Sequence, residues 1–228
     1  MVGAFQARGQ TIINGSFQQG GGSFTGWTTI GGVSIANSSV TTPTNGSAQA
    51  FIDNVSGTAV AAADLSAFFN NAVLPKDNFT TPRSATNGSA IKQTFVAAAP
   101  ETLSFDFKSV TAESLNSEWD MSVFYLDGNF IVLPNPDRNG AALNNSFGVT
   151  VNSSTYSFGF PYQTISVSLA AGSHTFGFAV YNTGDTAVLT GLFIDNVVAV
   201  PEPGVLELIS GGLVALAIAG WRRRAAVR

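Results

Sequence analysis

The chain has 228 residues, of which only 11% are charged, and it contains 24 glycines, 18 phenylalanines and no cysteine. The net charge of −4, with no basic patch before the C-terminal tail, argues against a nucleic-acid-binding protein, and the lack of cysteine excludes a disulfide framework or a thiolate metal site. About 190 residues remain once the two ends are set aside, which is enough for one all-β domain with a sizeable core.

The first nine residues do not read as part of a domain. Residues 1–10 lack the basic segment and the apolar run of about 7–15 residues that make up a complete signal peptide. We expect residues 1–9 to be disordered or to be the remnant of a signal peptide whose beginning was lost to a wrongly chosen start codon. An upstream reading frame that encodes a charged and hydrophobic leader would support this hypothesis.

The first motif places Asn14-Gly15-Ser16-Phe17 a few residues before Phe24-Thr25-Gly26-Trp27. It resembles the opening of galactose-binding-like β-sandwiches, which include several carbohydrate-binding modules. In those modules the residue after the first Phe is often a Glu that helps to hold a structural calcium ion. Here that residue is Gln18, whose uncharged amide should weaken such a site. Gln18 and Asp195 are therefore the calcium candidates, and no other cofactor is expected; the simpler interpretation is that Phe17 and Trp27 are core aromatics.

The middle of the chain predicts one short helix among many strands. Residues 58–70 are rich in alanine and lack proline, which favours a helix or helical turn, whereas residues 31–50 are polar and typical of turns up to a strand at 48–52. From residue 89 onward apolar side chains alternate with polar ones, and Asp127-Gly128-Asn129 indicates a hairpin turn. We expect about eight to ten strands in an antiparallel β-sandwich or jelly roll, which is an all-β fold class.

One five-residue sequence occurs twice, as residues 51–55 and 193–197, and each copy reads Phe-Ile-Asp-Asn-Val. One interpretation makes Asp53 and Asp195 equivalent ligands at two pseudo-symmetric positions. The interpretation that we favour is two strand ends, each with a turn in which the Asp or Asn side chain bonds to nearby backbone.

Residues suited to catalysis are few. His174 is the only histidine, and no Gly-x-Ser-x-Gly elbow accompanies it. The carboxylates that could supply a glycosidase acid–base pair are Glu101, Glu113, Glu118 and Asp120. Nothing in the sequence distinguishes them from solvated carboxylates at strand ends. We therefore predict that the protein is not an enzyme.

The last 28 residues form a three-part segment. Pro201-Glu202-Pro203 precedes an 18-residue apolar run, residues 204–221, and then Arg222, Arg223 and Arg224. The run is just long enough to cross a hydrocarbon core of about 30 Å. Arginines directly after such a span favour a cytoplasmic C-terminus, so we expect a single C-terminal transmembrane helix with the remainder outside the cytoplasmic membrane.

This segment resembles the PEP-CTERM sorting signal of Gram-negative bacteria. Residues 87–95, 103–107, 182–187 and 193–197 also resemble a recurring ectodomain of that group, in which the final Ile-Asp-Asn-Val strand leads into the Pro-Glu-Pro motif. The resemblance implies an exosortase as partner, an inner-membrane precursor, and delivery to the cell surface or extracellular matrix in an exopolysaccharide setting. A plain single-span anchor is the alternative.

Three functions remain open. The favoured one is a non-enzymatic exported surface or matrix protein associated with exopolysaccharide. The second is a carbohydrate-binding module in which exposed aromatics such as Trp119, Tyr125 or Tyr156 stack on sugar rings, and the third, more distant, is a glycoside hydrolase. The predicted boundaries are residues 1–9, an ectodomain over 10–199, a motif linker over 200–203, a transmembrane helix over 204–221 and a basic cytoplasmic tail over 222–228.

Overall fold

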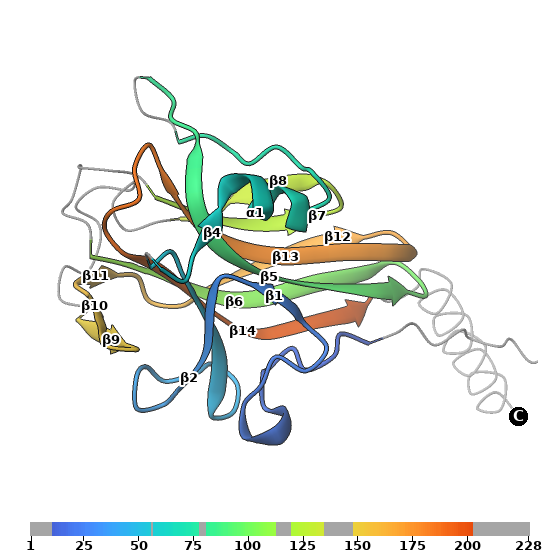
Figure 1. Cartoon of the computed structure of the whole chain (residues 1–228). Helices are drawn as coiled ribbons and strands as arrows, with labels where there is room; N and C mark the ends of the chain where they lie inside the picture. The colour runs from blue at the N-terminus through green and yellow to red at the C-terminus, as the bar shows by residue number, and fades with distance from the viewer. Residues whose placement is uncertain (1–10, 56, 78–80, 113–119, 135–147, 203–228) are drawn as a thin grey trace, which may run out of the picture.

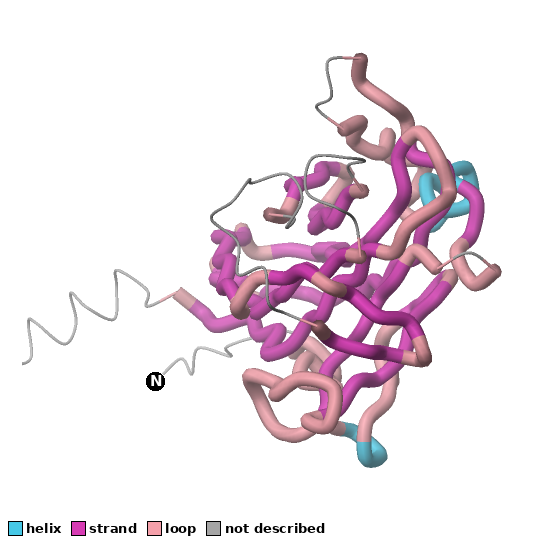
Figure 2. Tube along the Cα trace, turned by 90° about the vertical axis from the view of Figure 1, so that its left-hand side faces the viewer, coloured by secondary structure: helices cyan, strands magenta, loops and turns pink. Residues whose placement is uncertain are grey.

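Two antiparallel sheets packed face to face make up most of the structure (Figure 1). The computed structural model describes residues 11–55, 57–77, 81–112, 120–134 and 148–202. Strands dominate this part of the chain, and the short helices lie outside the sheets (Figure 2). The predicted all-β sandwich is therefore confirmed.

The first sheet, sheet A, has the strand order β1-β5-β13-β7-β8, and β4 pairs with one end of β5. Its strands are β1 (Thr28–Ile30), β4 (Val60–Ala61), β5 (Ala85–Ala97), β7 (Met121–Leu126), β8 (Asn129–Val132) and β13 (Gly172–Thr183). The predicted hairpin turn joins β7 to β8. Asp127 and Gly128 both have positive φ, at 48° and 92°, as the tight turn between two strands requires.

The second sheet, sheet B, has the order β11-β6-β14-β3-β2, and β12 also pairs with β6. Its strands are β2 (Gly32–Asn37), β3 (Ala48–Asp53), β6 (Glu101–Thr111), β11 (Phe158–Gly159), β12 (Gln163–Leu169) and β14 (Thr190–Pro201). A separate hairpin consists of β9 (Val149–Val151) and β10 (Ser154–Tyr156).

The main core lies between the two sheets. Phe105 and Phe107 of β6 point inward, and the ring of Phe105 packs 4.7 Å from Phe124 and 4.8 Å from Phe178 of sheet A. Phe17 and Trp27 are buried in the same cluster with their rings stacked at 5.1 Å, which confirms that they are core aromatics. Because side chains alternate along a strand, the residues between the inward phenylalanines of β6 lie on the outer face of sheet B.

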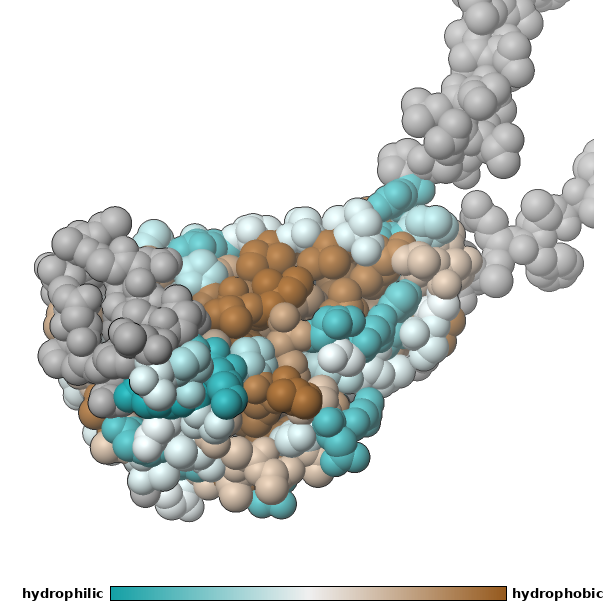
Figure 3. Space-filling view, turned by 90° about the horizontal axis from the view of Figure 1, so that it is seen from above, coloured by the Kyte–Doolittle hydropathy of each residue, from teal (hydrophilic) through white to brown (hydrophobic). Residues whose placement is uncertain are grey.

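The outer face of sheet A is covered by helix α1 (Ala62–Phe68). Leu65 and Phe69 pack on Tyr125 and Tyr181 in a second apolar cluster. The helix lies within the predicted range of 58–70 but begins later, because Val60 and Ala61 pair with β5 as strand β4. Seen from above Figure 1, this side of the molecule carries a band of hydrophobic surface (Figure 3).

Two details of the strand prediction are wrong. Residues 32–37, expected to be part of a turn-rich segment, form β2, because Val33 and Ile35 pack against the main core while the strand pairs with β3. The described residues contain fourteen strands, more than the expected eight to ten. The surplus includes β1, β4, β10 and β11, whose two or three residues are too short to produce a visible alternation.

The repeated five-residue sequence forms neighbouring antiparallel strands, β3 and β14. Phe51 and Phe193 are direct partners, with ring centroids 4.6 Å apart. Asp53 and Asp195 therefore lie on opposite sides of this pair and do not share a site. Asp53 ends β3 and accepts a bond from the Val55 amide, so the interpretation as a strand-end turn is confirmed for the first copy. The second copy lies inside β14, at an irregularity in the pairing between Asp195 and Val198, so the expectation of a second strand end is wrong.

Strand β14 carries the chain out of the sandwich at Pro201. Glu202 is exposed, and its amide donates to the Pro100 carbonyl at 2.9 Å. Pro203, the apolar run 204–221 and the arginines 222–224 lie outside the described residues. Within the described ranges, none of the helices is long and apolar enough to cross a membrane.

Candidate functional site

The outer face of sheet B carries charged side chains that are covered rather than exposed. Asp106 and Lys108 of β6, Asp195 of β14 and Gln49 of β3 occupy neighbouring strands on this face, and Asp106 is the direct partner of Asp195. Asp195 and Gln49 are fully buried. Long polar side chains are rarely buried without hydrogen-bonding partners, so their partners define how this face is built.

The two carboxylates are held by donors from surrounding loops. Asp195 accepts from the amides of Asn45 and Asn196, each at 2.7 Å, and from the Thr44 hydroxyl at 3.2 Å. Burial raises the pKa of Asp195, and these hydrogen bonds oppose the shift. Asp106 accepts from the Thr164 hydroxyl at 2.6 Å and from the Asn196 side-chain amide at 3.1 Å.

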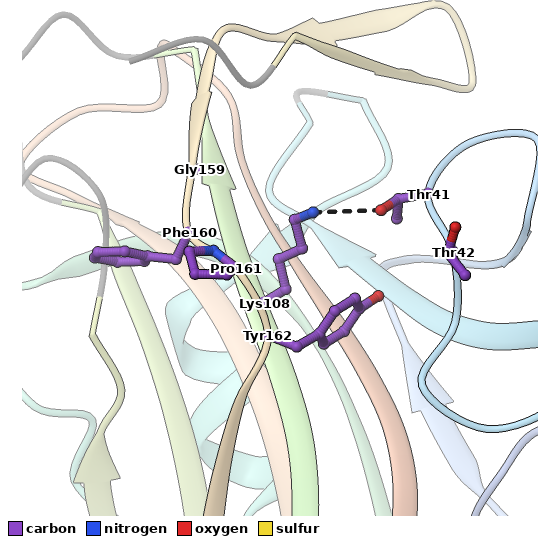
Figure 4. A pocket seen from close by; sticks show the side chains of 7 residues that line it. All are labelled: Thr41, Thr42, Lys108, Gly159, Phe160, Pro161 and Tyr162. Atoms are coloured by element: carbon purple, nitrogen blue, oxygen red, sulfur yellow. Dashed lines mark hydrogen bonds between the residues drawn. The ribbon is translucent and has the colours of Figure 1, made fainter. Parts of the chain in front are cut away.

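A pocket of about 380 Å³ opens beside these residues (Figure 4). Two segments form its walls: residues 41–42 from the loop between β2 and β3, and residues 159–162, which lead from the end of β11 to β12. Lys108 of β6 completes the pocket. In Figure 4 the side chains of Lys108 and Tyr162 run side by side toward Thr41 and Thr42, whereas the ring of Phe160 points to the other side.

Hydrogen bonds fix the two walls to sheet B. The Tyr162 hydroxyl donates to the Gln49 side-chain carbonyl, and the Gln49 side-chain amide donates to the Thr41 backbone carbonyl at 2.8 Å. Gln49 therefore connects the aromatic wall to the threonine wall. A pocket whose walls are bonded to a rigid sheet is preorganised, and a ligand need not order it on binding.

Lys108 is the charged residue of the pocket lining. Its Nζ donates to the Thr41 hydroxyl at 3.3 Å and lies 5.4 Å from the centre of the Tyr162 ring. Lys108 is only 5% exposed, and burial lowers the pKa of its amine from 10.5 to about 8. Burial also raises the pKa of Tyr162, as do the nearby charges of Asp195 and Asp106, so the Tyr162 hydroxyl stays protonated at neutral pH.

These groups are suited to binding a small ligand. The lining offers an aromatic ring, an ammonium and the hydroxyls of Thr41 and Thr42. An apolar wall with a few fixed polar groups is the usual composition of a small-molecule site. A sugar ring matches this combination, because it has an apolar face for an aromatic ring and hydroxyls for polar partners.

The predicted sugar-stacking aromatics do not form this site. Tyr125 is buried against Phe69, at 4.7 Å between ring centres, and Tyr156 is buried against Phe51 at 5.5 Å, so the expectation that they are exposed is wrong. Trp119 lies outside the described residues. The aromatic of the pocket is Tyr162. The feature of the sequence that indicates this tyrosine is the Phe160-Pro161-Tyr162 segment. Its proline interrupts the strand pattern, and the segment forms one wall of the pocket.

The predicted carboxylates are not brought together where the structure describes them. Glu101 begins β6 beside Pro201, whereas Asp120 accepts a bond from Asn54, next to Thr190 at the other end of β6. Ten residues of strand separate the two ends by roughly 30 Å, whereas a glycosidase pair needs about 5–9.5 Å. Glu113 and Glu118 lie outside the described residues.

Gln18 fills a cage of backbone carbonyls. Its side-chain nitrogen donates to the carbonyls of Ser16 and Ala48, each at 2.6 Å, and to that of Asn45 at 3.1 Å. Its side-chain oxygen accepts from the Ser47 amide at 2.9 Å. The amide nitrogen takes the place that a cation would occupy among the three carbonyls, so this arrangement does not fit a calcium ion.

Asp195, the other calcium candidate, bonds to the same loop but not to Gln18. It holds residues 44–45, and Gln18 holds residues 45–48. The two side chains thus fix the loop between β2 and β3 that carries Thr41 and Thr42. Among the residues that the structure describes, no cluster of three or more His, Cys, Asp or Glu side chains could hold a metal ion.

His174 lies away from the pocket, in sheet A near the β7–β8 turn. Its Nδ1 lies 2.6 Å from an Asp127 carboxylate oxygen, and its Nε2 lies 2.8 Å from the Ala170 carbonyl. Burial alone would lower the pKa of His174, but the bonds to Asp127 and Ala170 outweigh it and raise the pKa. The pair ties β13 to the turn.

Comparison with known proteins gives structural similarities only. No family model and no curated protein matches the sequence. One similar structure is a family 61 carbohydrate-binding module in complex with β-1,4-galactotriose, with a TM-score of 0.41 and 11% identity over 85% of this chain and 99% of that chain.

Two further structures are similar. The K1 cleaved adhesin domain of Lys-gingipain from Porphyromonas gingivalis has a TM-score of 0.46 and 12% identity over 82% of this chain and 96% of that chain. A family 28 carbohydrate-binding module specific for non-crystalline cellulose has a TM-score of 0.39 and 14% identity over 86% of this chain and 97% of that chain. With TM-scores below 0.5, these similarities carry no argument about the ligand.

Proposed function

We propose that the described domain is a non-catalytic carbohydrate-binding domain that holds a polysaccharide through the pocket on the outer face of sheet B. The observation that supports this proposal is the placement of Tyr162 beside Lys108, Thr41 and Thr42 between walls that Gln49 bonds together. An aromatic ring next to fixed polar groups can bind the apolar face and the hydroxyls of a sugar at once.

Affinity gel electrophoresis tests this function. The domain is run in gels that contain a neutral or an acidic polysaccharide, and retardation measures binding. Tyr162→Ala removes the ring and should abolish the retardation, whereas Tyr162→Phe keeps the ring and should retain most of it. Equal retardation of the wild type and Tyr162→Ala, with both folded by circular dichroism, would place any binding elsewhere.

We also propose that the protein is exported and sorted to the cell surface or matrix by an exosortase that reads Pro201, Glu202 and Pro203. Where it is described, this motif is exposed at the end of β14, eight residues beyond Phe193, the strand partner of Lys108. Eight residues of strand span roughly 25 Å, so a sandwich attached through the motif would keep its pocket well clear of the attachment point.

Intact mass and cell fractionation in the native host test the sorting. A mature form that ends near residues 201–203 and appears only when the exosortase is present would support processing. A full-length protein held in the inner membrane of both strains would reduce the C-terminal segment to an ordinary anchor.

A further inference from the structure

Strand β12 lies at an edge of sheet B. It pairs with β6 over all seven of its residues without a shift in register, and in the described part of the chain no strand pairs with its other side. The backbone N–H and C=O groups on that side therefore have no strand partner. Such an edge is a template for pairing with another chain, and natural proteins usually protect it with charged side chains, proline or a bulge.

Strand β12 has none of these protections. Gln163–Leu169 contains no charged residue and no proline, and its pairing is regular. The other edges of the two sheets differ. Strands β1 and β8 have only three and four residues, and the β9–β10 hairpin contacts β2, where the Asn152 side chain donates to the Ser34 hydroxyl at 3.0 Å. Within the described strands, β12 is therefore the long edge that lacks protection.

The side chains of β12 form two rows. Ile165 and Val167 face the main core together with their partners on β6, but they are only half-buried. The residues that alternate with them, Thr164, Ser166 and Ser168, are exposed on the outer face. The strand therefore offers an incompletely covered apolar row, a row of hydroxyls and an edge of backbone hydrogen-bonding groups.

A second copy of β12 complements all three features. In an antiparallel pair with Ser166 opposite Ser166, Ile165 of each copy lies opposite Val167 of the other. Thr164 likewise lies opposite Ser168. Opposed β-branched side chains and opposed hydroxyls both stabilise antiparallel strands. Each contact occurs twice, as a two-fold interface requires, and no like charges meet although the chain carries a net charge of −4.

We propose that two copies of the protein associate through β12, in antiparallel register centred on Ser166, so that their B sheets join into one. The partner is a second copy because an interface between two acidic chains is favoured where it is uncharged and self-complementary, and β12 is both. We expect a seven-residue edge to bury less than the roughly 1,200 Å² of a standard interface, so the dimer should be weak, with a dissociation constant on the order of micromolar.

The pairing has a consequence that rests on the proposed carbohydrate-binding function. Tyr162 directly precedes β12, and the two-fold axis would place both pockets on the same face of the joined sheet. The two Tyr162 residues would be eight strand positions apart, which is roughly 27 Å. A polysaccharide that reaches both pockets would bind with avidity.

Disulfide cross-linking of the full chain tests the pairing. The chain has no cysteine, so one introduced thiol reports one contact. In the proposed register Ser166→Cys places two thiols on directly opposed residues, whose Cα atoms lie about 4.5–5.5 Å apart, within the range of a disulfide. Thr164→Cys and Ser168→Cys are the matched controls. Each is exposed on the same face, but each would lie roughly 14 Å from its own counterpart.

The variants are oxidised with copper phenanthroline and separated by non-reducing electrophoresis. Ser166→Cys should give about tenfold more disulfide-linked dimer than either control alone, because the controls exceed the distance that a disulfide can bridge. A mixture of Thr164→Cys and Ser168→Cys should cross-link, because these two residues are opposed in the proposed register. Equal cross-linking by the three single variants, or none by Ser166→Cys at high micromolar protein, would overturn the pairing.

A second pair of variants tests the interface without changing the reporter. In the Ser166→Cys background, Val167→Lys puts a charge into the apolar row and should lower the yield of dimer about tenfold. Val96→Lys makes the same change at a valine of β5 that is 44% exposed, and it should leave the yield unchanged. Thermal unfolding verifies that each variant is folded. An equal yield from the two lysine variants would contradict the pairing. The cross-linking needs no ligand, so it tests the pairing separately from the proposed carbohydrate-binding function.

Discussion

The two outer faces of the sandwich are built from the same alternating strands, but the face of sheet A is apolar whereas the face of sheet B is partly polar. The outer face of sheet A presents Tyr125, Tyr181 and other apolar side chains, and it is covered by Leu65 of α1 and by Phe69, which directly follows the helix. The outer face of sheet B has two parts. In one, Phe51 and Phe193 pack with Tyr156 of β10 in a third apolar cluster, and in the other, Asp106 and Asp195 are covered by hydrogen-bonded loops.

This difference shows that the segment packed on the outer face of a sheet determines whether that face can bind a ligand. An apolar face is stabilised by close packing, which leaves no room for a ligand. On a polar face each buried polar atom needs a hydrogen-bonding partner. The segments that supply these partners are therefore positioned by hydrogen bonds rather than by close packing. The pocket of about 380 Å³ lies between two such segments. We therefore expect mutations on sheet A to affect stability and mutations on sheet B to affect binding as well.

The largest expected effect is on the sheet A side. Phe69→Ala removes a fully buried ring that packs on Tyr125 and should lower the free energy of unfolding by about 3–5 kcal/mol. Urea denaturation measures this loss. The matched control is Phe68→Ala, whose half-buried ring should cost less. Equal losses of unfolding free energy in the two variants would contradict the role of α1 as an apolar cover. A large change in the polysaccharide affinity of folded Phe69→Ala would contradict it as well.

The next effect concerns the loop that carries the threonine wall. Gln18→Glu places a carboxylate against the carbonyls that now accept from the Gln18 amide, and should cost about 1–3 kcal/mol in a chelating buffer. Millimolar calcium should restore stability to the variant, because the carbonyls and the new carboxylate are oxygen ligands. The urea midpoint with and without calcium is the measurement. A variant that calcium leaves unchanged would show that the cage cannot accept the ion.

The buried ammonium group of Lys108 in sheet B should make the stability of the domain depend on pH. Because burial lowers the pKa of Lys108 in the folded domain to about 8, the unfolded chain binds more protons than the folded chain between pH 8 and 10.5. Stability attributable to Lys108 therefore rises as pH increases through this window. Lys108→Met, which removes the charge, should be more stable than the wild type at pH 7 by about 1 kcal/mol, with the gap narrowing by pH 10. A constant difference in urea midpoint at the two pH values would contradict a buried charged amine.

Alternation in the sequence predicts most of the fold but little of the pocket. The inward positions of Phe105 and Phe107, and hence the outward positions of Asp106 and Lys108, follow from the period of two in β6. The Asp127-Gly128 turn follows from local chemistry alone. Both depend on residues close together in the sequence.

The pocket depends on residues that are distant in the sequence. Gln49 and Tyr162 meet only because β3 and β12 lie in one sheet, and no local pattern indicates that Thr41 will lie over Lys108. The tyrosines chosen as sugar-stacking residues illustrate the same limit. Tyr125 and Tyr156 occupy strands, as expected. Their burial by α1 and by neighbouring aromatic side chains depends on tertiary packing, which strand periodicity cannot predict.

The smallest expected effect concerns the pair of His174 and Asp127, near one end of the central strand β13 of sheet A, and it tests whether this exposed ion pair contributes to stability. Because its partners raise the pKa of His174 above 6.5, the pair contributes stability that is complete below pH 6.5 and is lost as pH rises through the folded-state pKa. Asp127 is 41% exposed, so the contribution should be on the order of 0.5 kcal/mol. His174→Gln should lower the urea midpoint slightly at pH 5.5 and not at pH 9. A loss of similar size at both values would mean that His174 stabilises β13 by packing against Phe95, at 6.0 Å between ring centres, rather than by its charge.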